Sequence, residues 1–581
     1  MGLLGNVKEK ADFIWAIADK LTGVYKPHEY GNVILPLTVI RRFDCVLSGT
    51  KKEVAEAVNE APAVYRVNAK MMDKRLCKVS GHSFYNTSPY TFETLLDDPD
   101  NIAANFRQYL QGFSANVREI IKRFNFDPEI TRMDEKGILY IVLQEFTKEK
   151  GDFHPDHISN LEMGYVFEEI IRKFSESSNE DAGQHYTPRE VIRLMVNILF
   201  MDDDEMLTSP DAIKTLYDPA CGTGGMLSVA SEYLKKLNAS ATLIPYGQEI
   251  NDQTFAICQA DTLIKGEDAS HIRPGNTLSD DQFAGDTFDY ILSNPPFGRE
   301  WKNEKKAVTD EQAKGFAGRF GAGVPAIGDS QMLFLETAVS KMKKTGSRVA
   351  IIHNGSPLFT GDAGSGPSEI RRYLLEHDLI EAIIALPNDI FYNTGIATYI
   401  WVLSNRKTPE RRGKVQLINA NGIYTKMRKS LGSKRVEISE EQIEEISRIY
   451  GDFRETEHCK IFPNEAFGYQ KITVERPLLG EDGQPIRKRG KLQPDPARRD
   501  TENVPLTESI DAYMQREVLP FAPDAWVDEK KTKIGYEIPF TRYFYHYEPP
   551  QPSAEISKDI RAIAKELDGS LEEIFGTEMV K

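Results

Sequence analysis

Short apolar runs alternate with stretches of helical periodicity between about residues 180 and 420, and this rhythm restricts the fold more than any other feature of the chain. The runs are TLYDPA, ATLIPYGQEI, FDYILSNPP, SRVAIIHNG, LIEAIIALP and ATYIWVLSN. Short hydrophobic strands separated by helices are typical of an α/β domain with a mostly parallel sheet. Ligands of such sheets bind at the carboxyl ends of the strands. The polar residues that end these runs are therefore the first candidates for function.

The segments on either side differ from this central part. Residues 1–160 carry apolar side chains at three- and four-residue spacing, which predicts an N-terminal all-helical domain. After residue 425 the strand–helix rhythm fades into a stretch rich in proline, glycine and charge, with a helical end. We therefore expect an α/β domain over 161–425 and a C-terminal extension over 426–581, made of helices and an irregular segment that provides subunit contacts.

Charge and cysteine content exclude several classes of protein. The 581-residue chain has a formal net charge of −16, so contact with nucleic acid requires a local basic patch or a partner. The five cysteines are scattered without a CxxC pair, which indicates neither a disulfide framework nor a metal site. Cys221, at a predicted helix start, could be an activated nucleophile, but a small residue filling a tight turn is the stronger interpretation. We find no apolar run of membrane-span length and no signal peptide, and expect a cytoplasmic protein.

The stretch TLYDPACGTGGML predicts a strand ending at Asp218, a glycine-rich turn and a helix. Gly222, Gly224 and Gly225 would let a ligand approach the backbone closely and leave helix amides free. The pattern is neither the dinucleotide fingerprint nor the phosphate loop. Glu249 ends the next strand, where a carboxylate suits the two hydroxyls of a ribose. A nucleoside ligand is the favoured hypothesis, and a tight turn with a capping acid is the alternative.

The segment GQHYTPREVIRLMVNILF, residues 183–200, lies just upstream. Thr187 as N-cap, Pro188 at the first helical position and Glu190 two residues later predict a capping box. This structural explanation leaves residues 184–186 unexplained. A helix N-terminus is a natural seat for a carboxylate, so the entrance of this helix is a candidate part of the ligand site.

The stretch YILSNPPF ends a hydrophobic strand with two prolines, so the strand must stop at Asn294. Asn294 and Pro295 then hold an amide oxygen and a carbonyl oxygen in fixed geometry. Two acceptors suit an amino group with two hydrogens, such as the exocyclic amine of a nucleobase. Phe297 offers a ring on which a flipped base can stack. The alternative is a plain strand-ending turn.

Together, DPACGTGG and NPPF resemble the motifs of amino-group DNA methyltransferases that use S-adenosyl-L-methionine. The stretches ILPLTVIRRFD, GQHYTP, IIHNGSPLF and ALPNDIFYNTGIATYIWVLS extend the similarity over roughly residues 10–470. On these motifs the chain is identified as a member of the modification (M) subunits of type I restriction-modification systems. The resemblance implies a Rossmann-like methyltransferase sheet, base flipping and methyl transfer to N6 of adenine in duplex DNA.

The resemblance also implies roles for individual residues. Asn294, Pro295, Pro296 and Phe297 would form the target site, and Glu249 would hold the cofactor ribose. Other cofactor-binding residues, mainly for the methionine part, would be Gln184, His185, Tyr186, Thr187, Pro188, Arg189, Asp218, Gly222, Thr223, Gly224 and Gly225. Where many relatives place an acid for the cofactor adenine, this chain has GNTL, so Asn276 takes that position.

The partners implied by the resemblance account for the negative charge. Type I M subunits leave sequence recognition to a specificity (S) subunit, two M subunits join one S, and a restriction (R) subunit can be added. Basic residues of the segment 302–329 would either contact DNA around the extruded base or belong to a mobile surface loop: Lys302, Lys305, Lys306, Lys314 and Arg319. A second basic group would meet DNA or the S subunit, although a solvated run is the stronger interpretation: Arg487, Lys488, Arg489 and Lys491.

Two alternatives to adenine methylation remain open at this point. The same chemistry could act on another amino group, that of cytosine N4 or of a glutamine side chain. The chain could also be a non-catalytic subunit that keeps the fold for assembly, although the intact glycine turn and NPPF argue against this.

Overall fold

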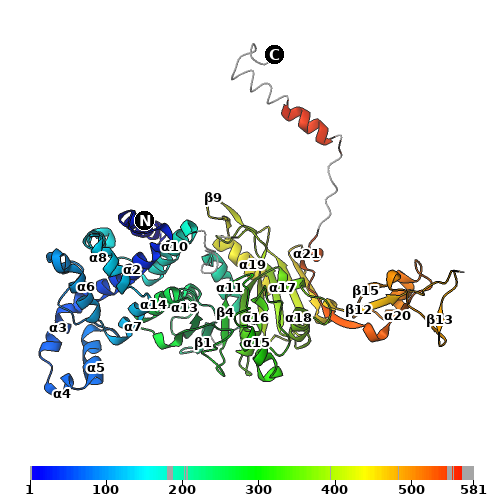
Figure 1. The fold of residues 1–581 in the computed structure, drawn as a ribbon, viewed down its shortest axis with the longest axis horizontal. Helices are drawn as coiled ribbons and strands as arrows, with labels where there is room; N and C mark the ends of the chain where they lie inside the picture. Colours follow the sequence, from blue (N-terminus) through cyan, green and yellow to red (C-terminus); the bar gives the residue numbers. More distant parts are fainter. Residues whose placement is uncertain are drawn as a thin grey trace, which may run out of the picture. The chain divides into compact units, whose positions relative to one another are not determined.

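The computed structural model describes residues 3–178, 187–201, 203, 207–392, 394–481, 483–545, 553 and 555–564 (Figure 1). The chain divides into a large unit, residues 1–538, and a small unit, residues 539–581. The small unit contains α21 (Phe540–Tyr543) and a helical stretch at 555–564. Among the described residues, no helix is both long enough and apolar enough to cross a membrane.

The N-terminal part of the large unit is helical, as predicted. Its helices are α1 (Leu3–Leu21), α2 (Gly31–Leu47), α3 (Lys51–Asn59), α4 (Ala63–Arg66), α5 (Ala69–Ser80), α6 (Ile102–Gln111), α7 (Ala115–Arg123), α8 (Asp127–Glu135), α9 (Leu139–Phe146) and α10 (Asn160–Ser178). Helix α2 is buried along nearly its whole length. The same core includes Ala256, Ile257, Ala260 and Leu263 of α14 (Asp252–Ile264), a helix that follows the second strand of the sheet.

The central part is a nine-stranded sheet, mostly parallel as predicted. Its strands are β1 (Ile213–Asp218), β2 (Thr242–Glu249), β3 (Ile272–Pro274), β4 (Tyr290–Ser293), β5 (Arg348–Asn354), β6 (Ile380–Ala385), β7 (Thr398–Ser404), β8 (Lys414–Asn419) and β11 (Cys459–Pro463). They lie in the order β11-β8-β6-β7-β5-β4-β1-β2-β3, with β7 and β11 antiparallel to their neighbours. The six predicted apolar runs form β1, β2, β4, β5, β6 and β7.

Helices cover this sheet and fill its core. They are α11 (Arg189–Phe200), α13 (Gly225–Leu237), α14, α15 (Lys305–Gln312), α16 (Gln331–Ser340), α17 (Ser356–Phe359), α18 (Gly366–Glu376) and α19 (Glu440–Asp452). Side chains of α11, α13 and α19 pack with the strands in one buried cluster. Phe255 and Cys258 of α14 belong to that cluster, so α14 contributes to both cores of the large unit.

The order of the strands brings four chain segments to one edge of the sheet. Strand order reverses between β1 and β4, which are hydrogen-bonded neighbours. Because β4, β1, β2 and β3 are parallel, the residues that follow Ser293, Asp218, Glu249 and Pro274 emerge side by side at their carboxyl ends. Such a switch point is where open α/β sheets bind ligands.

The C-terminal part contains the helix α19 and the helical stretch 555–564, and it also contains strands that were not predicted. A small antiparallel sheet forms from β12 (Gly468–Glu475), β15 (Asp500–Pro505), β16 (Trp526–Val527) and β17 (Lys533–Tyr536). The other elements are the hairpins β9 (Thr425–Leu431) with β10 (Lys434–Glu437) and β13 (Arg487–Lys488) with β14 (Lys491–Leu492), and α20 (Ile510–Tyr513). The large sheet continues past residue 425 to β11, and the division of the chain at 160 and 425 stays a prediction.

Candidate active site

The ends of β1 and β4 are joined directly beneath the site. The Ser293 hydroxyl donates to Oδ1 of Asp218 at 2.7 Å, and the Ala220 amide donates to the same atom at 3.0 Å. Complete burial raises the pKa of the Asp218 carboxyl to about 7, although these two hydrogen bonds oppose the shift. The glycine turn and the NPPF segment are therefore both anchored on the same buried carboxyl group, that of Asp218.

The glycine turn closes onto Glu249 of the neighbouring strand. The amides of Gly222 and Asn251 each donate to one Glu249 carboxylate oxygen at 2.8 Å. Gly222 and Gly224 have φ values of 54° and 82°, a region that favours glycine. A Cβ on Gly224 would lie 2.7 Å from Sγ of Cys258, so the turn has no room for a side chain there. Each Glu249 oxygen keeps a second lone pair for a ligand hydroxyl.

Asn294 is fixed at the end of β4 by a residue from far upstream. Its Nδ2 donates to Oγ1 of Thr187 at 2.8 Å. Its Oδ1 is buried and has no hydrogen-bond partner. Thr187, Asn294, Asp218 and Thr223 line one cavity together with Gly222 and Gly225. The structure thus brings the NPPF segment, the glycine turn and the segment before α11 to a single point.

The predicted capping box at the start of α11 is wrong. Pro188 is the N-cap, with an extended ψ of 137°, and the helix begins at Arg189. The Thr187 hydroxyl is engaged with Asn294 instead of the helix amides. The Glu190 carboxylate pairs with the Lys434 ammonium rather than reaching back to the cap. The helix starts one residue later than predicted, so the hydroxyl faces the site.

Sequence reasoning missed Glu168 of α10, which is 5% exposed and lines the same cavity. Its carboxylate forms an ion pair with the Arg189 guanidinium, which lies 3.6 Å from the ring centre of Tyr165. Burial raises the pKa of the Glu168 carboxyl, and Arg189 opposes that shift. A Cβ on Gly225 would lie 2.4 Å from Oε1 of Glu168, so the glycine gives this acid its place. The available signal was an acid within the apolar pattern YVFEEII.

The remaining predicted residues of this end lie nearby or outside the described chain. Gln184, His185 and Tyr186 lie outside the described residues. Pro188 and Pro295 are buried. Phe297 is half-buried, with its ring edge-on to Phe391 at a centroid distance of 6.2 Å, so part of the ring stays open to solvent.

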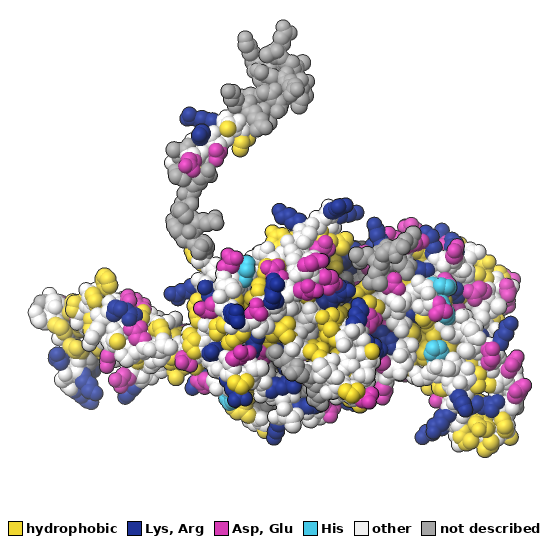
Figure 2. All heavy atoms as spheres, turned by 180° about the vertical axis from the view of Figure 1, so that it is seen from behind, with side chains coloured by type: hydrophobic (Ala, Val, Ile, Leu, Met, Phe, Trp, Pro, Cys, Tyr) yellow, Lys and Arg dark blue, Asp and Glu magenta, His cyan; other side chains and the backbone are white. Residues whose placement is uncertain are grey.

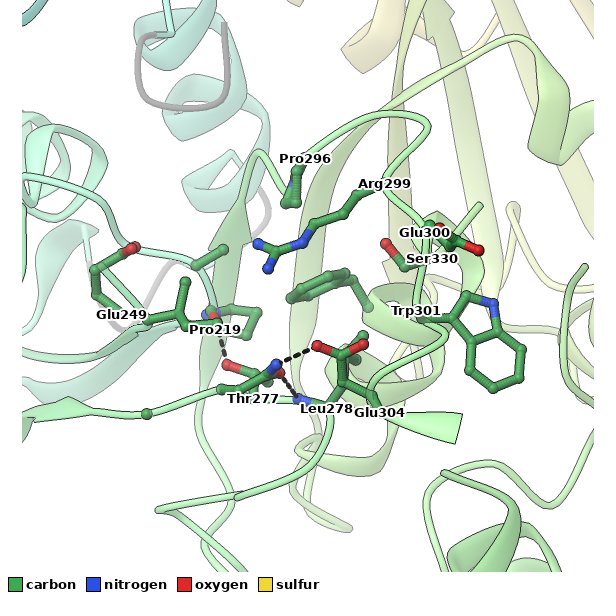
Figure 3. Close-up of a pocket in the computed structure, with 15 residues that line it drawn as sticks. Pro219, Glu249, Thr277, Leu278, Pro296, Arg299, Glu300, Trp301, Glu304 and Ser330 are labelled. Carbon is green, nitrogen blue, oxygen red and sulfur yellow. Dashed lines mark hydrogen bonds between the residues drawn. The ribbon is translucent and has the colours of Figure 1, made fainter. Parts of the chain in front are cut away.

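A second cavity begins at Glu249 and runs along the loop after β3 (Figure 3). Its lining includes Pro219, Ile250, Asn276, Leu278, Pro296, Arg299, Trp301 and Phe334. Glu304 also lines it, on the side opposite Glu249, and this acid was missed by sequence reasoning. Oε1 of Glu304 accepts from Nδ2 of Asn276 at 2.6 Å, and the Asn276 Oδ1 accepts from the Leu278 amide at 3.0 Å.

The segment 302–329 is packed rather than loose. Trp301, Val308 and Phe320 are buried, and residues 305–312 form α15. The Arg319 guanidinium pairs with Glu311 and donates to the carbonyl of Thr277 at 2.6 Å, so the predicted contact with DNA does not suit this residue. Lys302, Lys305, Lys306 and Lys314 are exposed.

The surroundings of Cys221 and of the basic residues 487–491 bear on the roles considered for them from the sequence. The hydrogen bond with Cys258, together with burial, raises the pKa of the Cys221 thiol, which does not suit a nucleophile. Arg487, Lys488, Arg489 and Lys491 are exposed at the β13–β14 hairpin. On the face drawn in Figure 2, the described acidic and basic side chains are interspersed rather than gathered in one broad basic surface.

Two family models match the chain. The model of the N-6 DNA methylase family matches residues 159–466, and that of the HsdM N-terminal domain matches residues 10–146. The MjaIX type I restriction enzyme methylase subunit of Methanocaldococcus jannaschii is 25% identical over 464 residues, covering 74% of this chain and 75% of the relative. The EcoEI methylase subunit of Escherichia coli is 28% identical over 329 residues, covering 54% and 60%.

Solved structures agree with the fold. The type I restriction-modification methyltransferase subunit of Streptococcus thermophilus superimposes with a TM-score of 0.60 at 21% identity, covering 79% of this chain and 96% of that one. A modification subunit of a putative type I restriction enzyme from Vibrio vulnificus gives a TM-score of 0.51 at 18% identity, covering 83% and 95%. At these identities the similarity establishes the fold alone.

Proposed function

The chain belongs to the N-6 DNA methylase family, and on that premise we propose that it transfers a methyl group from S-adenosyl-L-methionine to N6 of adenine in duplex DNA, as the M subunit of a type I restriction-modification complex. Relatives of this chain are methylase subunits of type I restriction enzymes by name. The NPPF segment and the glycine turn supply the site for this reaction.

One observation carries the proposal: the amide of Asn294 is locked with its oxygen unsatisfied. Because Nδ2 is held by Thr187, the buried Oδ1 is the end of the amide left to accept a hydrogen from a ligand. Leaving such an acceptor unpaired costs about 1–3 kcal/mol, so a donor that enters the cavity is bound favourably. An amino group of a flipped base is such a donor.

The residues of the two cavities fit S-adenosyl-L-methionine. Glu249 offers carboxylate lone pairs to the ribose hydroxyls, and Gly224 and Gly225 are packed too closely against Cys258 and Glu168 to carry side chains. Glu168 and Arg189 offer opposite charges to the ammonium and carboxylate of the methionine part. The bound cofactor would supply an electrophilic methyl group on a sulfonium.

The protein's part in the reaction is to prepare the amine. Its lone pair is delocalised into the adenine ring, which makes it a poor nucleophile. Oδ1 of Asn294 and the carbonyl of Pro295 would accept its two hydrogens, favour a pyramidal nitrogen and stabilise the positive charge that develops on it. Phe297 would stack on the flipped base. Asp218 and Ser293 keep the strand end rigid beneath these groups.

The charge of the chain supports a partner for DNA binding. With a net charge of −16, this subunit would gain little from phosphate contacts of its own. We propose that an S subunit brings the DNA, that two copies of this chain join one S, and that an R subunit can be added. This assembly would work in the cytoplasm, with its DNA substrate.

The test is transfer of a labelled methyl group to duplex DNA in the presence of a candidate S subunit. We expect label in N6-methyladenine, detected after enzymatic digestion of the DNA. Label in N4-methylcytosine would instead establish the alternative acceptor. Stable DNA binding without label, in a complex that binds the cofactor, would indicate an assembly subunit and contradict the proposal.

A further inference from the structure

We propose that Glu304 is the residue that recognises the 6-amino group of the cofactor adenine, and that Asn276 positions it. The inference rests on the proposed cofactor site and names a residue outside the motifs that define it. Glu304 lies 28 residues after Asn276 and is brought to it by the segment that follows the NPPF turn.

The first observation is an unsatisfied acceptor. Glu304 is 7% exposed, and its Oε2 is buried without a hydrogen-bond partner. The carboxylate lies in the wall of the cavity opposite Glu249, the acid proposed for the ribose (Figure 3). A buried carboxylate oxygen of this kind gains most from a donor of hydrogen bonds.

The second observation is that Asn276 is already committed. Its Oδ1 accepts from the Leu278 amide at 3.0 Å, and its Nδ2 donates to Oε1 of Glu304 at 2.6 Å. Both ends of the Asn276 amide are thus already engaged in holding the loop, whereas Oε2 of Glu304 is a buried acceptor with no hydrogen-bond partner. Asn276 therefore fixes the Glu304 carboxylate through Oε1 and leaves Oε2 of Glu304 for a ligand.

The third observation is that buried side chains and hydrogen bonds hold the segment that carries Glu304 in place. Trp301 is 2% exposed, and its Nε1 donates to the Ala326 carbonyl at 2.9 Å. Arg319 donates to the carbonyls of Thr277 and Leu278 at 2.6 and 3.2 Å, which ties the segment carrying Glu304 to the loop carrying Asn276. Rigid support of this kind is needed for specific recognition.

The chemistry of the ligand follows from these contacts. A nucleoside whose ribose is held by Glu249 would extend its base along this cavity, whose lining includes Ile250 and Pro296. Oε2 of Glu304 accepts a hydrogen from an exocyclic amine and repels an exocyclic carbonyl. The site should therefore distinguish adenine from hypoxanthine, which carries a 6-oxo group in place of the amine.

The experiment measures binding by titration calorimetry, without turnover. S-adenosylhomocysteine is compared with S-inosylhomocysteine, its 6-oxo analogue. We expect the wild-type chain to prefer the adenine compound about 100-fold, because a hydrogen bond to a charged group is lost and a repulsion is introduced. Glu304→Gln keeps the shape and can turn an amide donor to the cavity, so the preference should fall to about tenfold or less.

Asp310→Asn is the matched control, since Asp310 lies on the same segment but is exposed and outside the cavity lining. It should leave the preference unchanged. A folded Glu304→Gln variant that keeps the full preference would overturn the inference. If that variant fails to fold, the wild-type chain is titrated with the 6-dimethylamino analogue, which has no amine hydrogens; binding as tight as that of S-adenosylhomocysteine would also overturn it.

Failure of the proposed function has a different signature. If the wild-type chain binds neither S-adenosylhomocysteine nor its analogue, the cofactor site itself is misassigned. Tight binding of both compounds with equal affinity would leave the proposed function standing and contradict the role of Glu304 alone.

Discussion

The two ends of the proposed cofactor cleft are built in different ways. At the transfer end, Asn294, Thr187 and the glycine turn meet because neighbouring parallel strands end together. At the adenine end, Asn276 meets Glu304 because a segment folds back across the sheet edge and is tied down by Arg319. The first end depends on strand register and should govern the rate of transfer. The second depends on loop packing and should govern affinity and cofactor choice.

The largest expected effect is loss of transfer in Asn294→Ala. Removing the oxygen that accepts from the amine should lower the transfer rate by about 10³-fold, because charge stabilisation at the reacting nitrogen is lost. Affinity for S-adenosylhomocysteine should stay within about twofold, since Asn294 acts on the target base. The exposed Asn303→Ala is the control. Cofactor binding that falls as far as transfer would contradict the division between the two ends.

A second prediction concerns Asp218, beneath the transfer end, and the pH dependence of the free energy of unfolding. The folded pKa of Asp218, about 7, lies above its ordinary value of 3.8, so its contribution to the free energy of unfolding is fully present below pH 3.8 and is lost as pH rises to 7. The loss is about 4 kcal/mol at most, at about 1.4 kcal/mol per pKa unit.

Asp218→Asn removes this titration while keeping an acceptor for Ser293. The measurement is urea unfolding of both proteins from pH 4 to pH 8. We expect wild-type stability to fall relative to the variant across that range. The exposed Asp286→Asn variant should run parallel to the wild type. Parallel curves for Asp218→Asn would mean that the carboxylate is ionised in the fold.

Gly224→Val should disrupt the glycine turn. Its Cβ would lie 2.7 Å from Sγ of the buried Cys258, so the turn or helix α14 must shift. We expect at least about 100-fold weaker binding of S-adenosylhomocysteine, measured by calorimetry. Gly266→Val carries the same backbone strain, with φ of 77° against 82°, but meets nothing within 4 Å. Equal binding by the two variants would remove the glycine turn from the site.

The smallest effect is expected for Thr187→Val, which removes the acceptor for Nδ2 of Asn294 without touching the reacting oxygen. The turnover number should fall about tenfold, because the amide is no longer held in one orientation. KM for DNA should stay nearly constant, and Thr187→Ser should restore the rate. A rise in KM with unchanged turnover would assign Thr187 to binding instead.

Much of the fold was predictable because the buried strands are continuous apolar runs, and the strand ends that form the transfer end carry local motifs. Strand β3 was missed because it has three residues. Strand β15 was missed because most of its residues are exposed, and β12 because polar, half-buried or buried residues interrupt its apolar pattern. The role of Thr187 was obscured by a capping pattern that the helix does not use. No local pattern marks Glu304, since its position depends on the packing of Trp301 and Arg319.

Helix α14, which starts just after Glu249, has consequences for how this chain can be divided. Ala256, Ile257, Ala260 and Leu263 face the helical core, while Phe255 and Cys258 face the core under the sheet. A shortened protein that begins at residue 160 would expose an apolar stripe on α14, next to the strand that carries Glu249. The sequence pattern changes near residue 160, but the packing does not separate there. Because α14 is shared by both hydrophobic cores, we expect the helical part and the sheet to unfold together.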